Sequence, residues 1–374
     1  MSVQFLHRAY GKAYNRDMNL EFRAINQGGV NMRTTLMAQE ASASPEKIAL
    51  QLEKNNKTWR AICDYLIQHP FKFAATVARG SSDHGANFAK YLLEIHCGII
   101  TASIPPSVYT LYKSKPHVHD SLFLAISQSG QSPDLISTIK AVRTIATTIA
   151  LVNVVESPLA GAAEFIIPLY AGEEKAVAAT KSYIATLSAL AQFVAIYTKD
   201  KVLLEALQKL PEALYKATQL DFSPAIACLQ NKENAYVIGR GYGYAVAQEA
   251  ALKLKETAVL HAEPFSSAEV LHGPFSLIKP GFPVIVFAQN DTTAAGTIAL
   301  AQRIANMGAD VVFAMPGTKK IDALNPLPMV ESLHPMLDPI LIIQSFYIMA
   351  AELAVIRGFD PDQPRNLNKV TKTM

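Results

Sequence analysis

The stretch Leu122-Phe-Leu-Ala-Ile-Ser-Gln-Ser-Gly-Gln-Ser-Pro-Asp-Leu135 changes character twice. Its apolar start, 122–126, predicts a buried strand, and its Ser- and Gly-rich middle, 127–132, predicts a loop. A helix is expected from Pro133, with Ser132 as its N-cap and Asp134 in its first turn. Such a loop directs backbone N–H groups, hydroxyls and the positive end of a helix at one point, which is typical of a phosphate or other anion site. An ordinary strand-to-helix turn uses the same residue types.

The composition is that of a globular protein. The chain has 374 residues, of which 50% are hydrophobic and 17% are charged, and this length predicts about two domains. The net charge of +3 is too balanced to indicate a nucleic-acid or membrane partner. No apolar run reaches the roughly 20 residues of a membrane span. The cysteines have no paired spacing, which argues against a disulfide framework or a Cys metal site and favours a reducing cytoplasm.

Strands and helices alternate along the first half of the chain. After a helical region at 35–70, a strand at 73–78 leads into the loop Arg79-Gly-Ser-Ser-Asp-His-Gly85 and a helix that ends near His96. This alternation predicts an α/β fold with a parallel sheet and helices on both faces. The further strands are expected at 99–104, 122–126, 147–154 and 165–170, and the further helices at 133–146 and 177–198.

The second half repeats the first at a constant spacing. Arg240 follows Arg79 by 161 residues, and Gln289 follows Gln128 by the same 161. We therefore predict two tandem copies of one domain, each a doubly wound parallel sheet, joined near 200–220. Strands are expected at 234–238 and 284–288, with helices from about 245 and up to about 306.

The two copies differ in the residues that could bind an anion. Hydroxyls of the first copy are largely lost from the second, so a phosphate is expected only in the first copy. Both loops of that copy, 80–85 and 127–132, follow the carboxyl ends of strands, where open parallel sheets bind ligands. The loops can therefore converge on one ligand. The residue pairs that differ are Ser127 and Ala288, Ser129 and Asn290, and Ser132 and Thr293.

Three charged residues lie on one face of the helix expected from about 245. Glu249, Lys253 and Glu256 are spaced i, i+4 and i+7. A solvated surface face with an ion pair worth about 0.3–0.5 kcal/mol is one interpretation. The neighbouring residues are apolar almost all round, however, and charges on a buried helix need partners. This favours an active-site face.

Downstream of this helix, His272 precedes Gly-Pro on a predicted loop, where functional groups are common. No pair of His and carboxylate residues has the helical spacing of a zinc site, so no metal is expected. The polar, Pro-rich tail after 357 could be a frayed terminus.

Eight ordered motifs between Met37 and the C-terminus resemble the sugar isomerase (SIS) family, specifically the isomerase half of glutamine–fructose-6-phosphate aminotransferase, or glucosamine-6-phosphate synthase. The motifs are Met37-x-x-Glu40, Gly80-Ser81-Ser82, Ser127-Gln-Ser-Gly-Gln-Ser132, Val177-Ala-x-Thr-Lys181, Glu249-x-Ala-Leu-Lys253-Leu-Lys-Glu256, His261-Ala-Glu263, His272-Gly-Pro274 and Asp362-Gln-Pro-Arg-Asn-Leu-x-Lys369.

The resemblance implies a role for each matching position. Glu256 would move a proton between C1 and C2 of the sugar, and Lys253 would assist. His272 would open the sugar ring from the neighbouring subunit of a homodimer. Lys369 would close the site, and a lysine at its position can form an imine with the sugar. No cofactor is implied. The residues implied to bind the sugar phosphate are Ser81, Ser82, Ser127, Gln128, Ser129, Ser132, the backbone near Val177, and Glu249.

Departures from the synthase pattern favour another reaction. The synthase has a glutaminase domain with a cysteine nucleophile at its start, whereas the first cysteine here is Cys63, so we expect no ammonia release from glutamine. Its Cys-Gly-Thr-Ser loop is replaced by Arg79-Gly-Ser-Ser, the Lys before His-Gly-Pro by Leu271, and Lys-Ser-Val-Thr by Asn-Leu-x-Lys-Val-Thr. These variations resemble SIS-type glucosamine-6-phosphate deaminases.

The expected activity is therefore conversion of glucosamine 6-phosphate and water to fructose 6-phosphate and ammonia, by ring opening, C2-to-C1 proton transfer and imine hydrolysis. The alternatives are a fructosamine-phosphate deglycase, a phosphosugar isomerase and a non-catalytic sugar-phosphate sensor. The expected organisation is an N-terminal extension (1–31) that is loosely ordered or packs on a partner subunit, two SIS domains (32–210 and 211–356) and a tail that closes the site (357–374).

Overall fold

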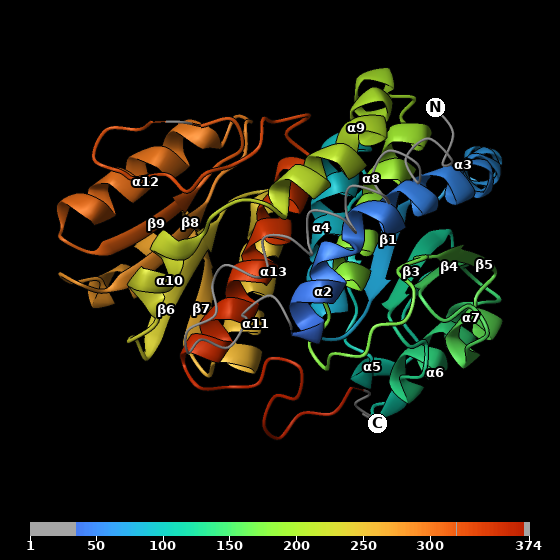
Figure 1. The fold of residues 1–374 in the computed structure, drawn as a ribbon. Coiled ribbons are helices and arrows are strands. Elements are labelled where there is room, and N and C mark those ends of the chain that lie inside the picture. The colour runs from blue at the N-terminus through green and yellow to red at the C-terminus, as the bar shows by residue number, and fades with distance from the viewer. Residues whose placement is uncertain (1–34, 319, 370–374) are drawn as a thin grey trace, which may run out of the picture.

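The computed structural model describes residues 35–318 and 320–369. Within them the chain forms two parallel sheets, which lie on either side of a block of helices (Figure 1). The first sheet has the order β2-β1-β3-β4-β5 and the second the order β7-β6-β8-β9. The strands are β1 Phe73–Val77, β2 Thr101–Ser103, β3 Ser121–Ser127, β4 Thr147–Val152, β5 Phe165–Pro168, β6 Asn234–Gly239, β7 His261–Ser266, β8 Pro283–Phe287 and β9 Asp310–Ala314.

Helices cover both faces of each sheet, as predicted, because the strands are apolar on both sides. A large core between the sheets joins their inner faces to α3, α4, α8, α11 and α13. A smaller core packs α6 and α7 on the outer face of the first sheet, and another packs α12 on the second. The bounds are α2 Leu36–Ser42, α3 Ser44–Gln68, α4 Ser81–His96, α5 Ser107–Thr110, α6 Pro133–Val142, α7 Pro158–Ala162, α8 Lys181–Tyr197, α9 Lys201–Ala217, α10 Ser223–Leu229, α11 Tyr242–Ala258, η2 Glu269–Leu271, η3 Pro274–Leu277, α12 Ala294–Asn306 and α13 Asp338–Ile356.

The predicted internal repeat is visible where its two copies meet. Helix α4 of the first copy packs against α11 of the second. The amide of Asn87 donates to the amide oxygen of Gln248 at 2.6 Å, and these residues are 161 positions apart. Equivalent positions of the two copies therefore touch each other between the sheets. The predicted boundary between 210 and 211 falls inside α9, which together with α10 connects the copies.

The first sheet brings the two predicted ligand loops together. Strands β1 and β3 are adjacent and parallel, with Val77 opposite Ala125. The loops that follow them therefore leave the same edge of the sheet side by side. Each loop runs directly into a helix, α4 at Ser81 and α6 at Pro133.

Helix α13 is the most apolar helix of the described part of the chain. By length and composition alone, this helix could cross a membrane. This differs from the expectation that no apolar segment reaches that length. Within the protein, 83% of its apolar window is buried, and it packs against α11, α2 and α9. These contacts are those of a central core helix.

Several helix boundaries differ from the prediction. Helix α4 begins at Ser81, inside the loop expected over 79–85, because the N–H groups of Asp83 and His84 bond to the Gly80 carbonyl and close the first turn. Helix α11 begins at Tyr242 and not at about 245. The helix expected over 133–146 ends at Val142, because Ile145 and Ala146 bond back to Val142 in the turn that leads to β4. The helix expected from 177 begins only at Lys181, because Val177 donates its backbone N–H to Asp362 in the tail. The predicted extension 1–31 lies outside the described residues.

Candidate active site

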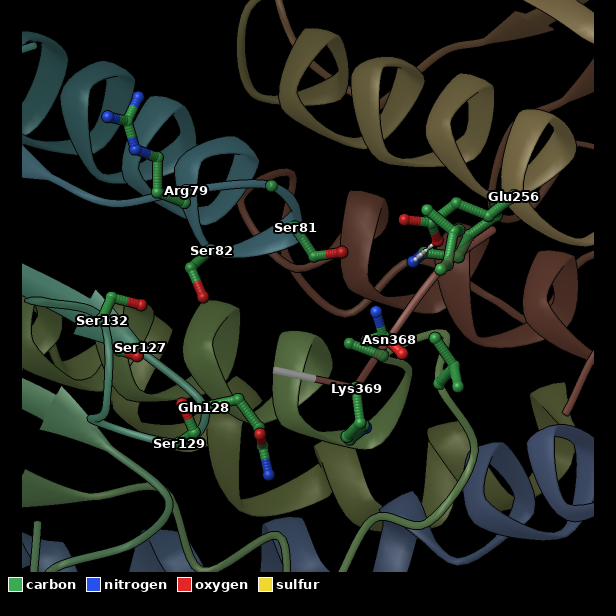
Figure 2. Close-up of a pocket in the computed structure, with 15 residues that line it drawn as sticks. Arg79, Ser81, Ser82, Ser127, Gln128, Ser129, Ser132, Glu256, Asn368 and Lys369 are labelled. Carbon is green, nitrogen blue, oxygen red and sulfur yellow. Dashed lines mark hydrogen bonds and ion pairs between the residues drawn. The ribbon is translucent and has the colours of Figure 1, made fainter. Parts of the chain in front are cut away.

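A cavity of about 320 Å³ opens at the carboxyl edge of the first sheet. It is formed by the loops after β1 and β3, the segment before α8, one face of α11 and the C-terminal tail (Figure 2). All predicted site residues line it except Glu249 and His272. The lining residues are Arg79, Gly80, Ser81, Ser82, Ser127, Gln128, Ser129, Ser132, Val177, Ala179, Lys253, Glu256, Leu367, Asn368 and Lys369.

One end of the cavity is lined by serine hydroxyls (Figure 2). The hydroxyls of Ser127 and Ser129 accept from backbone N–H groups within their own loop, at 3.0 and 3.3 Å. Gly130 makes this turn with φ +63°, and a side chain there would meet the Ser157 hydroxyl at 2.1 Å. The loop thus needs glycine to fold its hydroxyls inward.

Two helices begin at this end without a side-chain cap. Ser132 occupies the N-cap position of α6, as predicted, but its hydroxyl makes no cap hydrogen bond. Gly80 is the N-cap of α4 and has no side chain to offer. First-turn N–H groups of α4 therefore remain available to a ligand, whereas in α6 Pro133 has no N–H and the N–H of Leu135 donates to Asp134 Oδ1. The dipoles of both helices favour an anion. The geometry suits a phosphate group.

The opposite end of the cavity carries a carboxylate and an ammonium group from α11 (Figure 2). Lys253 is 1% exposed and contacts the Glu256 carboxylate. Burial lowers the pKa of Lys253, but the carboxylates of Glu249 and Glu256 outweigh burial and raise it above its ordinary value. Lys253 is therefore a charged ammonium group, although it is buried.

Glu249 lies beneath the cavity and not on its surface, which differs from its expected contact with substrate. Its side chain is fully buried and accepts from the Tyr347 hydroxyl and His84 Nδ1, both at 2.9 Å. Burial raises the pKa of Glu249, but the nearby Lys253 and His84 outweigh burial and bring the pKa below its ordinary value. The group is therefore ionised. Glu249 therefore acts on the site through Lys253, 3.5 Å away.

The tail folds over the cavity and is not frayed through residue 369. Lys369 Nζ donates to the Ala176 carbonyl at 2.7 Å and to Glu174 at 3.3 Å. The carboxylate of Asp362 accepts from the backbone N–H groups of Leu36 and Met37, the start of α2, at 2.8 and 2.7 Å. These bonds tie the tail to the segment before α8 and to the first described helix.

His272 stands apart from this cavity. It is exposed, and it connects η2 to η3 in the second copy. Within the chain it does not line the pocket, so its expected role depends on a second subunit. Among residues 35–318 and 320–369, no cluster of three or more His, Cys, Asp and Glu side chains could hold a metal ion.

In the second copy, a carboxylate occupies the loop that corresponds to the serine-rich loop 127–132 of the first copy. Asp291 stands at the position equivalent to Gly130, 161 residues later. Its carboxylate accepts from the backbone N–H and hydroxyl of Thr293 and from the amide of Gln289, at 2.6–3.1 Å. Donors of this loop are thus already occupied by an internal anion, which supports a single phosphate site per chain.

Several residues of the site were not singled out from the sequence. Leu367 and Asn368 lie beside the predicted Lys369 in the tail motif, and Arg79 begins the predicted loop. His84 lies in a quoted loop, but its partner Glu249 is 165 residues away. Tyr347 and Glu174 had no local signal.

Comparison with known proteins fits this geometry. Residues 72–196 and 228–314 match the SIS domain family. The chain belongs to this family. The two matched segments correspond to the two halves of the fold, and membership makes the chain a relative of the phosphosugar isomerases.

Individual proteins that are similar to this SIS protein belong to the same group. A glutamine–fructose-6-phosphate aminotransferase [isomerizing] from Methanothermobacter thermautotrophicus is 30% identical over 298 residues, which cover 78% of this chain and 50% of the relative. The chain thus spans about half the length of the curated relatives it matches. A crystal structure from Silicibacter pomeroyi DSS-3, provisionally named a phosphosugar isomerase, has 39% identity and a TM-score of 0.83, covering 88% of this chain and 100% of that one.

A glucosamine-6-phosphate deaminase from Thermotoga maritima shares the fold of this SIS protein. Its TM-score is 0.74 at 19% identity, and the match covers 91% of this chain and 100% of that one.

Proposed function

We propose that this SIS protein is a glucosamine-6-phosphate deaminase, which converts glucosamine 6-phosphate and water to fructose 6-phosphate and ammonia. The observation that carries the proposal is the polarity of the cavity. Uncapped helix N-termini and serine hydroxyls lie at one end, and a carboxylate in contact with a buried ammonium lies at the other. Such a cavity suits a sugar with a phosphate at one end and a proton to be moved at the other.

The proton transfer is assigned to Glu256. With the sugar ring open, the C1 carbonyl acidifies the C2 proton, Glu256 removes it, and a proton returns to C1 through an enolamine. Water then adds to the resulting C2 imine, and ammonia leaves to give fructose 6-phosphate. Lys253 contacts Glu256 and orients its carboxylate. Acid–base catalysis of this kind contributes about 10²–10⁴-fold to a rate.

Ring opening is assigned to His272 of a neighbouring subunit in a homodimer. Its exposure leaves it free to enter another subunit's cavity. Lys369 lies over the cavity and holds the tail closed through Glu174 and Ala176.

An isomerase without amine loss is the second candidate. The Silicibacter pomeroyi relative is named a phosphosugar isomerase, and the same Glu256 proton transfer would interconvert an aldose and a ketose phosphate. A fructosamine-phosphate deglycase would use that transfer to expel an amino acid.

Product analysis separates these activities. Purified protein is incubated with glucosamine 6-phosphate, and ammonia and fructose 6-phosphate are measured in parallel. Equal amounts of both products, at about one turnover per second or faster, are expected. Tight binding of fructose 6-phosphate without any ammonia would refute the deaminase and lead to assays with aldose phosphates and fructosamine phosphates.

A further inference from the structure

Arg79 forms an ion pair that joins the two serine loops. It lies between β1 and α4, and its partner Asp134 lies in the first turn of α6. Arg79 Nε and Nη2 each lie 2.9 Å from the same oxygen, Asp134 Oδ2, while Asp134 Oδ1 accepts from the backbone N–H of Leu135. The Asp134 side chain is completely buried, and that of Arg79 is 49% exposed.

The guanidinium group of Arg79 is not directed at the serine hydroxyls of the cavity (Figure 2). Figure 2 shows the Arg79 side chain directed away from the hydroxyls of Ser82, Ser127 and Ser129. Its pairing with Asp134 instead fixes the start of α4 against the start of α6. A guanidinium donating two hydrogen bonds holds its partner in one geometry, which an ammonium group cannot do.

The second copy provides an internal comparison. Its Arg240 is equivalent to Arg79, but the counterpart of Asp134 is Ala295, also 161 positions later. Arg240 Nη1 donates to the Ser266 hydroxyl at 3.1 Å instead. The arginine is thus present in both copies, whereas the ion pair between loops is present only in the copy with an open anion site. If the ion pair only stabilised the sheet, we would expect it in both copies.

We propose that Arg79 is a positioning residue for the substrate phosphate, because its ion pair with Asp134 sets the spacing at which the two serine loops converge on one phosphate group. The inference rests on the proposed function only in taking a sugar phosphate as the ligand.

The test compares the wild type with Arg79→Ala, Arg79→Lys, Asp134→Asn and the double variant Arg79→Ala/Asp134→Asn. Arg240→Ala is the matched control. The dissociation constant of fructose 6-phosphate is measured by calorimetry, KM and kcat are measured with glucosamine 6-phosphate, and thermal unfolding verifies that each variant is folded.

Each of the three single variants of the pair should weaken fructose 6-phosphate binding by about tenfold, or about 1.4 kcal/mol. These variants are Arg79→Ala, Arg79→Lys and Asp134→Asn. The double variant should be no weaker than the singles, because all of them lose one shared interaction. KM should rise while kcat stays close to that of the wild type. Arg240→Ala should bind as the wild type does.

Unchanged binding by Arg79→Ala would overturn the inference. So would tighter binding by Asp134→Asn together with normal binding by Arg79→Lys, since Arg79 would then act by charge alone. Absence of fructose 6-phosphate binding by the wild type would also overturn it. Absence of ammonia from a wild type that binds fructose 6-phosphate would refute only the deaminase, and the binding comparison would still decide this inference.

Discussion

The ammonium group of Lys253 lies 3.5 Å from a carboxylate oxygen of Glu249, and neither side chain is more than 1% exposed. The two residues are one helical turn apart on α11. Glu249 is held from below by His84 of α4 and Tyr347 of α13. Three helices from both copies therefore fix one charge pair, which in turn positions Glu256.

Glu249→Gln should strongly destabilise the protein. The substitution leaves the Lys253 charge with less compensation inside the protein, and loss of one partner of a buried pair costs about 3–5 kcal/mol. Urea unfolding at neutral pH measures the effect. Glu212→Gln removes an exposed i,i+4 partner of Lys216 and should change stability by less than about 0.5 kcal/mol. Equal unfolding midpoints for the two variants would contradict the assignment.

The same pair predicts a loss of stability in acid. The folded pKa of Glu249 is held below its ordinary value of 4.5, so its contribution is complete above pH 4.5 and disappears as the pH falls through the folded pKa. The pKa of Lys253 is raised, so its contribution persists throughout this range. Urea midpoints between pH 7 and pH 3 should fall less steeply in Glu249→Gln than in the wild type. Parallel curves would show that Glu249 does not titrate as inferred.

Local sequence signals predicted the frame of the site well. The strand before Arg79 and the end of α4 at His96 followed from the local pattern, although α4 begins at Ser81, inside the predicted loop. The constant spacing of 161 residues predicted the second copy. The charged face of α11 was visible because its neighbours are apolar. These features depend on periodicity and turn chemistry, which are written in short stretches of sequence.

Contacts across the fold could not be predicted in this way. Nothing near Glu249 indicates that His84 and Tyr347 are its partners, since they are 165 and 98 residues away. The late start of α8 has a similar cause. The distant tail binds the backbone N–H of Val177 through the Asp362 carbonyl, and Glu174 in the preceding loop accepts from the N–H groups of Thr180 and Ser182. Together these contacts override the helical tendency of 177–180.

Glu256→Gln should abolish most of the turnover and leave phosphate binding intact. The amide keeps the shape of the side chain but cannot accept the C2 proton, so kcat should fall by about 10²–10⁴-fold. Ammonia release and fructose 6-phosphate binding are measured on the same preparation. Glu205→Gln, at an exposed position of α9, should behave as the wild type. Undiminished turnover of Glu256→Gln would exclude Glu256 as the base.

Asp362→Ala should loosen the tail without unfolding the core. The variant removes an acceptor for the first N–H groups of α2, a contact type worth about 0.5–2 kcal/mol, and weakens the attachment of Lys369 over the cavity. We expect a higher KM for glucosamine 6-phosphate and faster proteolysis after residue 357. Asp64→Ala, an exposed substitution on α3, is the control. Wild-type KM and wild-type protease resistance of Asp362→Ala would contradict a closing role.

The asymmetry between the copies predicts one phosphate site per chain, in the first copy. Calorimetric titration with fructose 6-phosphate should therefore give one site per chain. Ser132→Ala removes a hydroxyl that lines the cavity and should weaken binding by about tenfold or more, the value of a hydrogen bond to a charged group. Its counterpart Thr293→Ala should leave binding unchanged, because Thr293 already donates to Asp291. Two sites per chain, or equal losses in the two variants, would show that the second copy also binds phosphate.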